Sequence, residues 1–265
     1  MSRLSGVTVI TGGASGIGAA CGRVLRERGA EVVVLDRDIA RARDVAAEIG
    51  GHAVAGDVGD ADAIEQAADA IERTHGPVEI LVNSAGVIQR PVSPDALPMS
   101  VWDDVVRIDQ RGTYVACLAF GRRMAQRRRG AIVNIASIAG MRSMPLHAYS
   151  PAKAAVISMT ENLAAEWGRA GVRVNAISPG FTRTPALQAA IDRGERDTTT
   201  LARLSALGRM VEPEEIARSA AFLCSDDAAA ITGINLPVDC GWLVGTSWQT
   251  YGGLREAADG AERRP

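Results

Sequence analysis

A tyrosine and a lysine four residues apart, Tyr149 and Lys153 in the segment YSPAK, form a candidate catalytic pair. At this spacing both side chains lie on one face of a helix. A tyrosine phenol, with an ordinary pKa of about 10, is a poor base at neutral pH, but a nearby ammonium stabilises the phenolate. Ser137, at the end of a predicted strand, could hold the substrate oxygen while Tyr149 moves the proton. These residues predict proton transfer at an alcohol or a carbonyl group.

The segment TGGASGIG, residues 11–18, predicts a phosphate-binding loop between a strand and a helix. Glycine has no Cβ, so backbone N–H groups and the helix N-terminus could approach a pyrophosphate. Ser15 could add a hydroxyl donor. The candidate cofactor contacts here are Gly12, Ser15, Gly16, Ile17 and Gly18. An ordinary glycine-rich turn is the alternative interpretation.

Asp36, at the end of the second predicted strand, indicates which dinucleotide the loop would take. A carboxylate there accepts hydrogen bonds from the adenosine ribose and would repel a 2′-phosphate, which favours NAD. Arg37 could hold that phosphate, so NADP stays possible. A helix N-cap is the other role open to Asp36, although Asp38 is better placed for it.

Seven β-branched apolar runs alternate with longer helical patterns. The runs are 7–11, 31–36, 52–58, 79–83, 130–137, 173–178 and 233–239, and the helices are expected at 16–29, 38–49, 60–75, 100–126, 149–169 and 213–225. This alternation predicts an α/β fold, a doubly wound parallel sheet with helices on both faces. We expect one domain over residues 1–265, with a substrate lid at 185–210 and a C-terminal extension at 242–265. Residues 242–255, rich in aromatics, should pack on a neighbouring subunit or over the active-site mouth.

Composition excludes several classes of function. The chain has 265 residues, a net charge of −2 and 47% hydrophobic residues. A nucleic-acid-binding protein needs a basic excess, and a membrane helix needs about 18 apolar residues in a row, so neither partner is expected. The N-terminus lacks a signal-peptide core, and four scattered cysteines without a CxxC pair predict free thiols, so we expect a cytoplasmic protein. The three histidines are dispersed along the chain, and no metal site is expected.

Taken together, the motifs resemble the short-chain dehydrogenase/reductase superfamily, in its main single-domain branch with a Rossmann fold. The resemblance covers about residues 4–241. It rests on TGGASGIG, Asp36, GDV at 56–58, NSAG at 83–86, NIAS at 134–137, YSPAK at 149–153, and SPG followed by FTRT at 178–184.

The resemblance implies roles for the matching positions. Ser137, Tyr149 and Lys153 would be the catalytic trio, with Lys153 also holding the nicotinamide ribose. The remaining cofactor contacts would be Asp57 and Val58 at the adenine, Asn83, Ala85 and Gly86 along the cofactor floor, and Pro179, Gly180, Thr182 and Thr184 around the carboxamide. Members of the superfamily commonly form tetramers, so a homotetramer is expected.

Two positions depart from the family pattern. Asp109 stands where the family usually has an asparagine, whose backbone carbonyl helps to hold a water in a proton relay. Aspartate keeps that carbonyl, so Asp109 is a candidate catalytic residue whose change to asparagine should be tolerated, although its charge could also tune Lys153. Cys240 replaces a usual glycine, with an expected effect on packing alone.

The sequence therefore predicts an NAD-dependent oxidoreductase that interconverts a secondary alcohol and a ketone. Its small-molecule substrate would be a sugar, a polyol or another small hydroxy compound. Two alternatives remain open: an NADP-dependent reductase of 3-oxoacyl groups on a carrier protein, and a non-catalytic dinucleotide sensor. A basic cluster at residues 122–129 could dock an acidic carrier protein or could be a solvated helix end.

Overall fold

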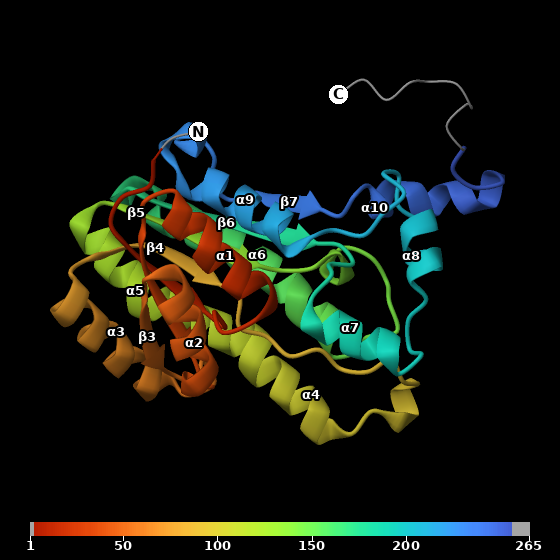
Figure 1. Ribbon diagram of the computed structural model, residues 1–265, viewed down its shortest axis with the longest axis horizontal. Helices are drawn as coiled ribbons and strands as arrows, with labels where there is room; N and C mark the ends of the chain where they lie inside the picture. Colours follow the sequence, from red (N-terminus) through yellow and green to blue (C-terminus); the bar gives the residue numbers. More distant parts are fainter. Residues whose placement is uncertain (1–2, 256–265) are drawn as a thin grey trace.

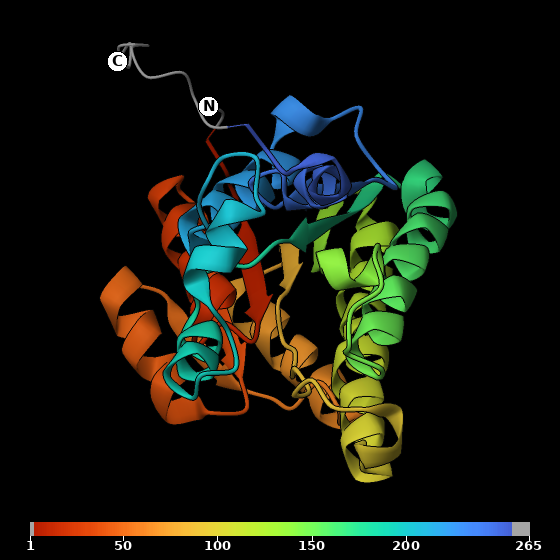
Figure 2. The same cartoon turned by 90° about the vertical axis from the view of Figure 1, so that its right-hand side faces the viewer.

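The computed structural model describes residues 3–255 and shows a parallel sheet between two layers of helices (Figures 1 and 2). The sheet has seven strands in the order β3-β2-β1-β4-β5-β6-β7. The strands are β1 (Val7–Thr11), β2 (Glu31–Asp36), β3 (His52–Ala55), β4 (Val78–Asn83), β5 (Gly130–Ile135), β6 (Val172–Pro179) and β7 (Asn235–Val238). The predicted doubly wound α/β fold is confirmed.

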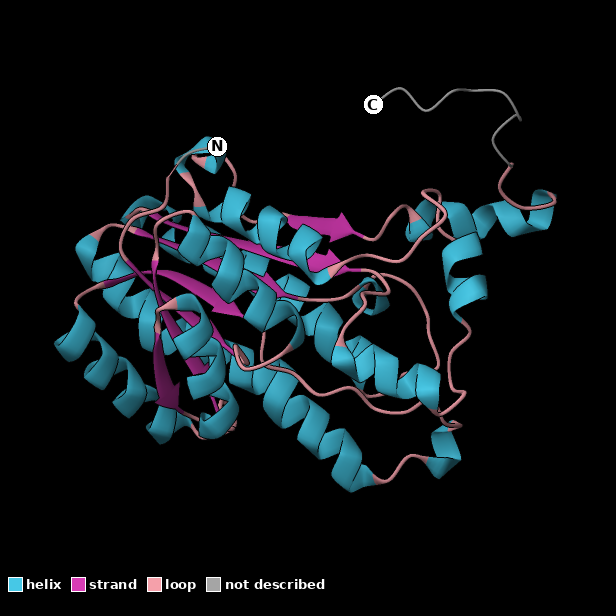
Figure 3. Ribbon diagram, in the orientation of Figure 1, coloured by secondary structure: helices cyan, strands magenta, loops and turns pink. Residues whose placement is uncertain are grey.

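Helices cover both faces of the sheet because the central strands are apolar on both sides. Every residue of β1 is buried, as are the four middle residues of β2, which is typical of a covered parallel sheet. One face packs against α1 (Gly16–Glu27), α2 (Ile39–Ile49) and α9 (Pro213–Cys224). The other packs against α3 (Ala61–His75), α5 (Thr113–Arg127) and α6 (Tyr149–Trp167). Figure 3 shows these layers.

The strand order reverses at β1, which pairs with β2 on one side and β4 on the other. The connections that leave these strands therefore run to opposite sides and open a crevice at their carboxyl ends. Ligands of open α/β sheets bind in such a crevice. The fold thus places the chain segments after β1, β2, β4, β5 and β6 around one site.

The helix expected at 100–126 is interrupted in the middle. It consists of α4 (Met99–Val105), a π-helical stretch (Val106–Gly112) and α5. Tight packing accompanies the wider turns: a Cβ on Gly112 would lie 2.7 Å from the Val58 side chain. Thr113 Oγ1 donates to the carbonyl of Asp109 at 2.7 Å. Interruptions of this kind are frequent at functional sites, and this one contains Asp109.

The excursion after β6 is held at its two ends by backbone contact. Thr182 and Val211 form an isolated parallel bridge, with Val211 N donating to Phe181 O at 2.9 Å. Between them lie α7 (Pro185–Asp192) and α8 (Thr198–Arg203), at the right of Figure 1. The region 185–210, predicted to be a lid, is therefore a helical segment hinged next to the carboxyl end of β6.

The C-terminal segment forms α10 (Trp242–Gly245) and a 3₁₀ turn (Thr246–Tyr251). Trp242 packs edge-to-face on Phe181, with ring centroids 5.4 Å apart. Trp248 and Tyr251 are 47% and 89% exposed. The part of the extension beyond Arg255 lies outside the described residues. Four short 3₁₀ turns complete the fold, at Pro94–Ala96, Ile138–Gly140, Gly168–Ala170 and Asp226–Ala228. Within residues 3–255, no helix is long and apolar enough to cross a membrane.

Candidate active site

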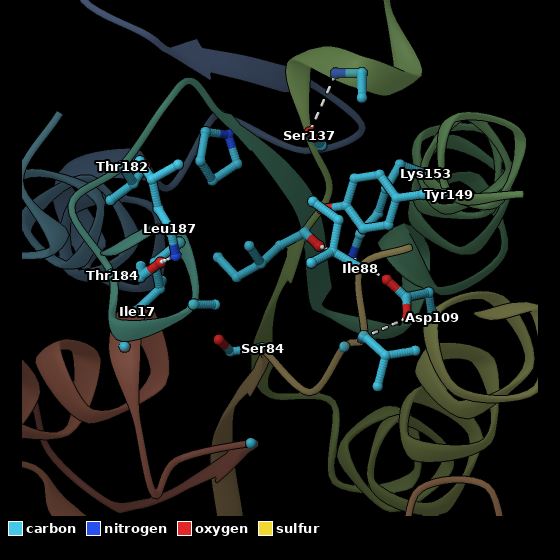
Figure 4. A pocket seen from close by; sticks show the side chains of 18 of the residues that line it. Ile17, Ser84, Ile88, Asp109, Ser137, Tyr149, Lys153, Thr182, Thr184 and Leu187 are labelled. Carbon is cyan, nitrogen blue, oxygen red and sulfur yellow. Dashed lines mark hydrogen bonds and ion pairs between the residues drawn. The ribbon is translucent and has the colours of Figure 1, made fainter. Parts of the chain in front are cut away.

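A cavity of about 900 Å³ lies at the carboxyl ends of the central strands. The predicted site residues line it, with the exceptions of Gly18 and Asn83. Those that line it are Gly12, Ser15, Gly16, Ile17, Asp36, Arg37, Asp57, Val58, Ala85, Gly86, Asp109, Ser137, Tyr149, Lys153, Pro179, Gly180, Thr182 and Thr184. Figure 4 shows Tyr149, Lys153 and Asp109 on one wall of the cavity, and Thr182 and Thr184 across from them.

Tyr149 and Lys153 lie one helical turn apart at the beginning of α6. The Lys153 ammonium is 5.4 Å from the centre of the Tyr149 ring and donates to the backbone carbonyl of Ile135 at 3.0 Å. Ser137 follows β5, where its Oγ accepts from Ala139 N at 3.1 Å, and its side chain lowers the pKa of Tyr149. The three residues thus converge from the end of β5 and the first turn of α6.

The position of Tyr149 is fixed by Gln89, which the sequence placed near the trio but whose capping role it did not reveal. Gln89 follows β4 and is 4% exposed. Its Oε1 accepts from Ala148 N at 2.5 Å and from Tyr149 N at 3.2 Å. The first N–H groups of a helix have no partner within the helix, and Ala148, at the N-cap of α6, has no side chain that could supply one. A glutamine distant in sequence therefore caps the helix that carries Tyr149.

Asp109 is fully buried and contacts two parts of the site. Its Oδ1 accepts from Val87 N, in the loop after β4, at 2.8 Å. Its Oδ2 lies 3.1 Å from Lys153 Nζ, and has no other partner among the described residues. The carboxylate, and not only the backbone carbonyl, therefore belongs to the site.

Burial and charge act in opposite directions on the Tyr149 phenol. Burial raises the pKa of Tyr149 above its ordinary value, the Lys153 ammonium lowers it, and the Asp109 carboxylate raises it again. Burial lowers the pKa of Lys153, but Asp109 and Tyr149 outweigh that effect, so the net pKa of Lys153 is raised. The Lys153 ammonium thus lowers the pKa of Tyr149 in the expected direction, but burial and Asp109 outweigh it, so the net pKa of Tyr149 is raised.

The glycines of the loop after β1 let its backbone pack closely at the wall of the cavity. Gly12 has a φ of 65°, and a Cβ there would lie 2.5 Å from the Ala85 backbone. A Cβ on Gly18 would collide with the carbonyl of Gly12, so Gly18 serves the packing of the loop rather than its lining. Ser15, the N-cap of α1, makes no side-chain cap, which leaves the first N–H groups of α1 directed at the cavity. These features fit a dinucleotide.

Asp36 and Asp57 line the far end of the cavity, where an adenosine would lie. The Asp36 carboxylate accepts from Ala14 N at 3.1 Å and from Asp38 N at 2.9 Å, which ties the end of β2 to the phosphate loop. The N-cap of α2 is Asp38, so the alternative cap role of Asp36 is excluded. Arg37 and Arg41 line the same end.

Asn83 does not reach the cavity surface. It is 3% exposed, and its Nδ2 donates to Asn134 Oδ1 at 2.9 Å. Asn134 in turn donates to Thr160 Oγ1 at 3.0 Å. The chain of amides joins β4, β5 and α6 beneath the site. Asn83 therefore supports the strands that carry the loops, and the direct cofactor contact predicted for it has no counterpart in the cavity lining.

The opposite end of the cavity, next to Tyr149, has mixed chemistry. Its apolar part includes Ile88, Leu187 and the Phe181–Trp242 pair. Its charged part lies at the rim, where Glu195 of the 185–210 segment is 3.5 Å from Arg90 and 2.7 Å from Arg193. The apolar residues could contact the carbon skeleton of a small substrate, and the charged rim could bind its hydroxyl groups. The apolar side chains of the 185–210 segment and Trp242 cover this end.

Comparison with known proteins agrees with this arrangement. Residues 12–243 match a family described as Enoyl-(Acyl carrier protein) reductase. The chain is 41% identical over 249 residues to D-threitol dehydrogenase of Mycolicibacterium smegmatis, covering 91% of this chain and 95% of the relative. It is 38% identical over 246 residues to NAD-dependent glycerol dehydrogenase of Listeria innocua, covering 90% and 94%.

Two solved structures share the fold. A crystal structure of ribose-5-phosphate isomerase from Brucella melitensis superposes with a TM-score of 0.95 at 52% identity, covering 96% of this chain and 99% of that chain. An oxidoreductase of the short-chain dehydrogenase/reductase family from Burkholderia thailandensis superposes with a TM-score of 0.86 at 36% identity, covering 95% and 97%. With the sheet order, the glycine loop and the family match in agreement, the chain belongs to the short-chain dehydrogenase/reductase superfamily, whose members are oxidoreductases that use nicotinamide dinucleotides.

Proposed function

We propose that the protein is an NAD-dependent dehydrogenase that interconverts a secondary alcohol and a ketone on a small polyol or sugar. The observation that carries this proposal is the convergence of Ser137, Tyr149 and Lys153 on the cavity that the glycine loop also lines. A protein that only sensed a dinucleotide would need the loop but not this trio. Catalysis therefore accounts for more of the site than binding alone does.

In the proposed reaction, Tyr149 exchanges the proton and Ser137 holds the substrate oxygen. NAD, when bound, supplies the hydride chemistry at its nicotinamide ring. During alcohol oxidation the Tyr149 oxygen takes the hydroxyl proton, and during ketone reduction it returns that proton. Lys153 stabilises the phenolate by its charge, and Gln89 orients the backbone of Tyr149 by capping α6. Leu187 and Trp242 line the substrate end of the cavity and offer apolar contacts to the carbon skeleton of the substrate.

The preference for NAD rests on Asp36. Its carboxylate lies at the end of β2, on the cavity wall and tied to the glycine loop. A ribose with free hydroxyls can donate to this carboxylate, whereas a 2′-phosphate would bring a second negative charge to it. A relative described as an NAD-dependent glycerol dehydrogenase supports the same preference.

The substrate class is inferred from the cavity and the relatives together. Two relatives are named for threitol and glycerol, which are small polyols. The substrate end of the cavity combines apolar side chains with a charged rim. A short chain of hydroxylated carbons could place one hydroxyl on Tyr149 and Ser137 and the others toward the rim.

An NADP-dependent reductase of 3-oxoacyl groups is the second candidate. Arg37 and Arg41 line the adenosine end and could accept a 2′-phosphate. The basic cluster that could dock a carrier protein is largely paired, however. Arg122 and Arg123 contact Glu65, and Arg127 and Arg129 contact Glu72 and Glu79. These pairs reduce the positive field available to an acidic partner, so the polyol dehydrogenase is preferred.

A substrate and cofactor panel tests the proposal. Purified protein is assayed for reduced cofactor with D-threitol, galactitol and glycerol, each with NAD and with NADP. A 3-oxoacyl thioester with NADPH serves as the competing assay. We expect oxidation of at least one polyol, with kcat/KM higher for NAD than for NADP. Turnover of the thioester alone would support the second candidate. A protein that binds NADH but turns over no alcohol or ketone would support the sensor.

Assembly and location remain predictions of the proposal. A homotetramer in the cytoplasm is expected from the family resemblance. Light scattering on the purified protein measures its mass, and a mass close to four chains of 27.8 kDa is the expected result.

A further inference from the structure

Two of the three histidines of the chain meet a glutamate at the edge of the sheet opposite the active site. Glu31 begins β2, His52 begins the neighbouring strand β3, and His75 ends α3. Parallel strands begin at the edge away from their carboxyl ends, so this cluster is separated from the cavity by the length of the sheet. Its residues are far apart in the sequence, which explains why their spacing gave no sign of a metal site.

The imidazole nitrogens of His52 and His75 and a carboxylate oxygen of Glu31 lie close together. His52 Nε2 and His75 Nδ1 each lie 3.4 Å from the same Glu31 oxygen, Oε1, and the three donor atoms all lie within 4.8 Å of one another. The two imidazole rings face each other, with centroids 4.1 Å apart and planes tilted by 34°. Both rings therefore present a nitrogen to the same carboxylate oxygen.

We propose that Glu31, His52 and His75 bind a zinc ion. Zinc in proteins is tetrahedral, with bonds of about 2.0–2.2 Å to imidazole nitrogen and carboxylate oxygen. In a tetrahedron of that size two ligand atoms are about 3.4 Å apart, which is the separation of each nitrogen from Glu31 Oε1. Two imidazoles and one carboxylate make a ligand set that zinc uses elsewhere, with the fourth position left to water.

The supporting backbone makes the three ligands a preformed group. Glu31 N donates to Gly6 O at 3.1 Å, and Glu31 is in register with Val7 of β1. His52 is in register with Val33 of β2, and Gly76, next to His75, donates to Glu72 O at 3.1 Å. The side chain of His75 is 15% exposed, while those of His52 and Glu31 are 45% and 43% exposed. An ion could therefore enter from solvent without rearrangement of the sheet.

Glu31, His52 and His75 do not line the cavity, so we expect such an ion to stabilise the fold rather than to take part in catalysis. It would join the first residues of β2 and β3 to the last turn of α3. This link would stabilise β3, which is the outermost strand of the sheet. Anything that binds the folded state alone raises its stability. The proposal does not depend on the dehydrogenase activity, because the cluster lies at the opposite edge of the sheet.

Zinc titration of the tag-free, full-length protein tests the proposal. After removal of metals with a chelator, ZnCl₂ binding is measured by calorimetry, and melting is followed at increasing zinc concentration. We expect one zinc per chain and a rise in melting temperature of roughly 5 °C or more when zinc exceeds the dissociation constant 100-fold. MgCl₂ should cause no such rise, because magnesium prefers oxygen ligands.

Four variants locate the site. His52→Gln and His75→Gln should each weaken zinc binding by more than about tenfold and abolish the rise in melting temperature. His147→Gln and Cys240→Ser should leave both unchanged, since they remove the remaining histidine and the partly exposed cysteine. Because the His52 side chain is largely exposed, His52→Gln should leave the fold intact. The proposal is overturned if the wild type takes up no zinc, or if binding survives in both of the first two variants.

Discussion

The Lys153 ammonium and the Asp109 carboxylate lie 3.1 Å apart inside the protein, where Asp109 is fully buried and Lys153 nearly so. Asp109 belongs to the π-helical stretch and also accepts from Val87 N. The pair therefore links the long interrupted helix, the loop after β4 and the first turn of α6. An asparagine could keep the hydrogen bond to Val87 but could not balance the charge of Lys153.

Asp109→Asn should move the pH profile of alcohol oxidation to lower pH. The Asp109 carboxylate raises the pKa of Tyr149, so its removal lowers that pKa. The phenolate that accepts the proton exists above the pKa, and the rising limb of the oxidation rate therefore shifts downward. In the reduction direction the falling limb should shift downward as well. Measurement of kcat against pH for both proteins checks this.

The pH-independent kcat of Asp109→Asn should stay within about tenfold of the wild-type value, because the amide oxygen can still accept from Val87 N. Tenfold corresponds to about 1.4 kcal/mol of activation free energy. Asp109→Ala, which loses that acceptor too, should be slower. An unchanged pH profile in the asparagine variant would show that the charge of Asp109 does not reach Tyr149.

Asp36→Ala should weaken NAD use and relatively favour NADP. The substitution removes the acceptor for the ribose hydroxyls and the charge that opposes a 2′-phosphate. It also releases Ala14 N of the glycine loop, so affinity for both cofactors should decrease, and that for NAD more. The ratio of kcat/KM with the two cofactors is the measurement. A wild-type protein that already prefers NADP would show that Arg37 and Arg41 outweigh the carboxylate.

Gln89→Ala should destabilise the protein by about 1–3 kcal/mol and lower kcat. It leaves the N–H groups of Ala148 and Tyr149 without their acceptor, and unsatisfied buried donors cost that amount. Urea unfolding measures the stability. Gln89→Glu keeps an acceptor at the positive end of α6 and should recover much of the loss. Equal damage in both variants would mean that Gln89 acts by packing rather than as a cap.

Trp242→Ala should raise KM more than it lowers kcat. Trp242 lines the substrate end of the cavity and packs edge-to-face on Phe181, an arrangement that contributes about 0.5–1.5 kcal/mol beyond area burial. Trp248→Ala is the matched control, because Trp248 is 47% exposed and does not line the cavity. If the control raises KM as much, the C-terminal segment acts on the substrate through another contact, such as a neighbouring subunit.

The sequence predicted the sheet well because its signals are local. The runs that became β1, β2 and β4 are rich in apolar β-branched residues without clean alternation, and burial on both sides follows from that pattern. The glycine loop and the Tyr149–Lys153 pair are also short-range patterns. Their convergence on one cavity follows from the strand order, because every parallel strand delivers its following loop to the same edge.

Features that depend on distant contacts escaped prediction. In the π-helical stretch, Gly112 packs against Val58, some fifty positions earlier in the sequence. Gln89 becomes a cap because β4 and α6 meet in space, and Glu31, His52 and His75 meet only once β2, β3 and α3 have paired and packed. Cys240 adopts a φ of 52°, a left-handed conformation that explains why a glycine usually stands there, and the residue type alone gave no sign of it.

Tyr149→Phe gives the most direct test of the proposed chemistry. The ring keeps its packing, and only the hydroxyl that moves the proton is lost. General acid–base groups contribute about 10²–10⁴-fold to rate, so kcat for polyol oxidation should decrease by that factor while NADH affinity, measured by fluorescence titration, stays within a few-fold of wild type. A phenylalanine variant that oxidises the polyol at nearly the wild-type rate would contradict the assignment of Tyr149 as the proton-transferring group.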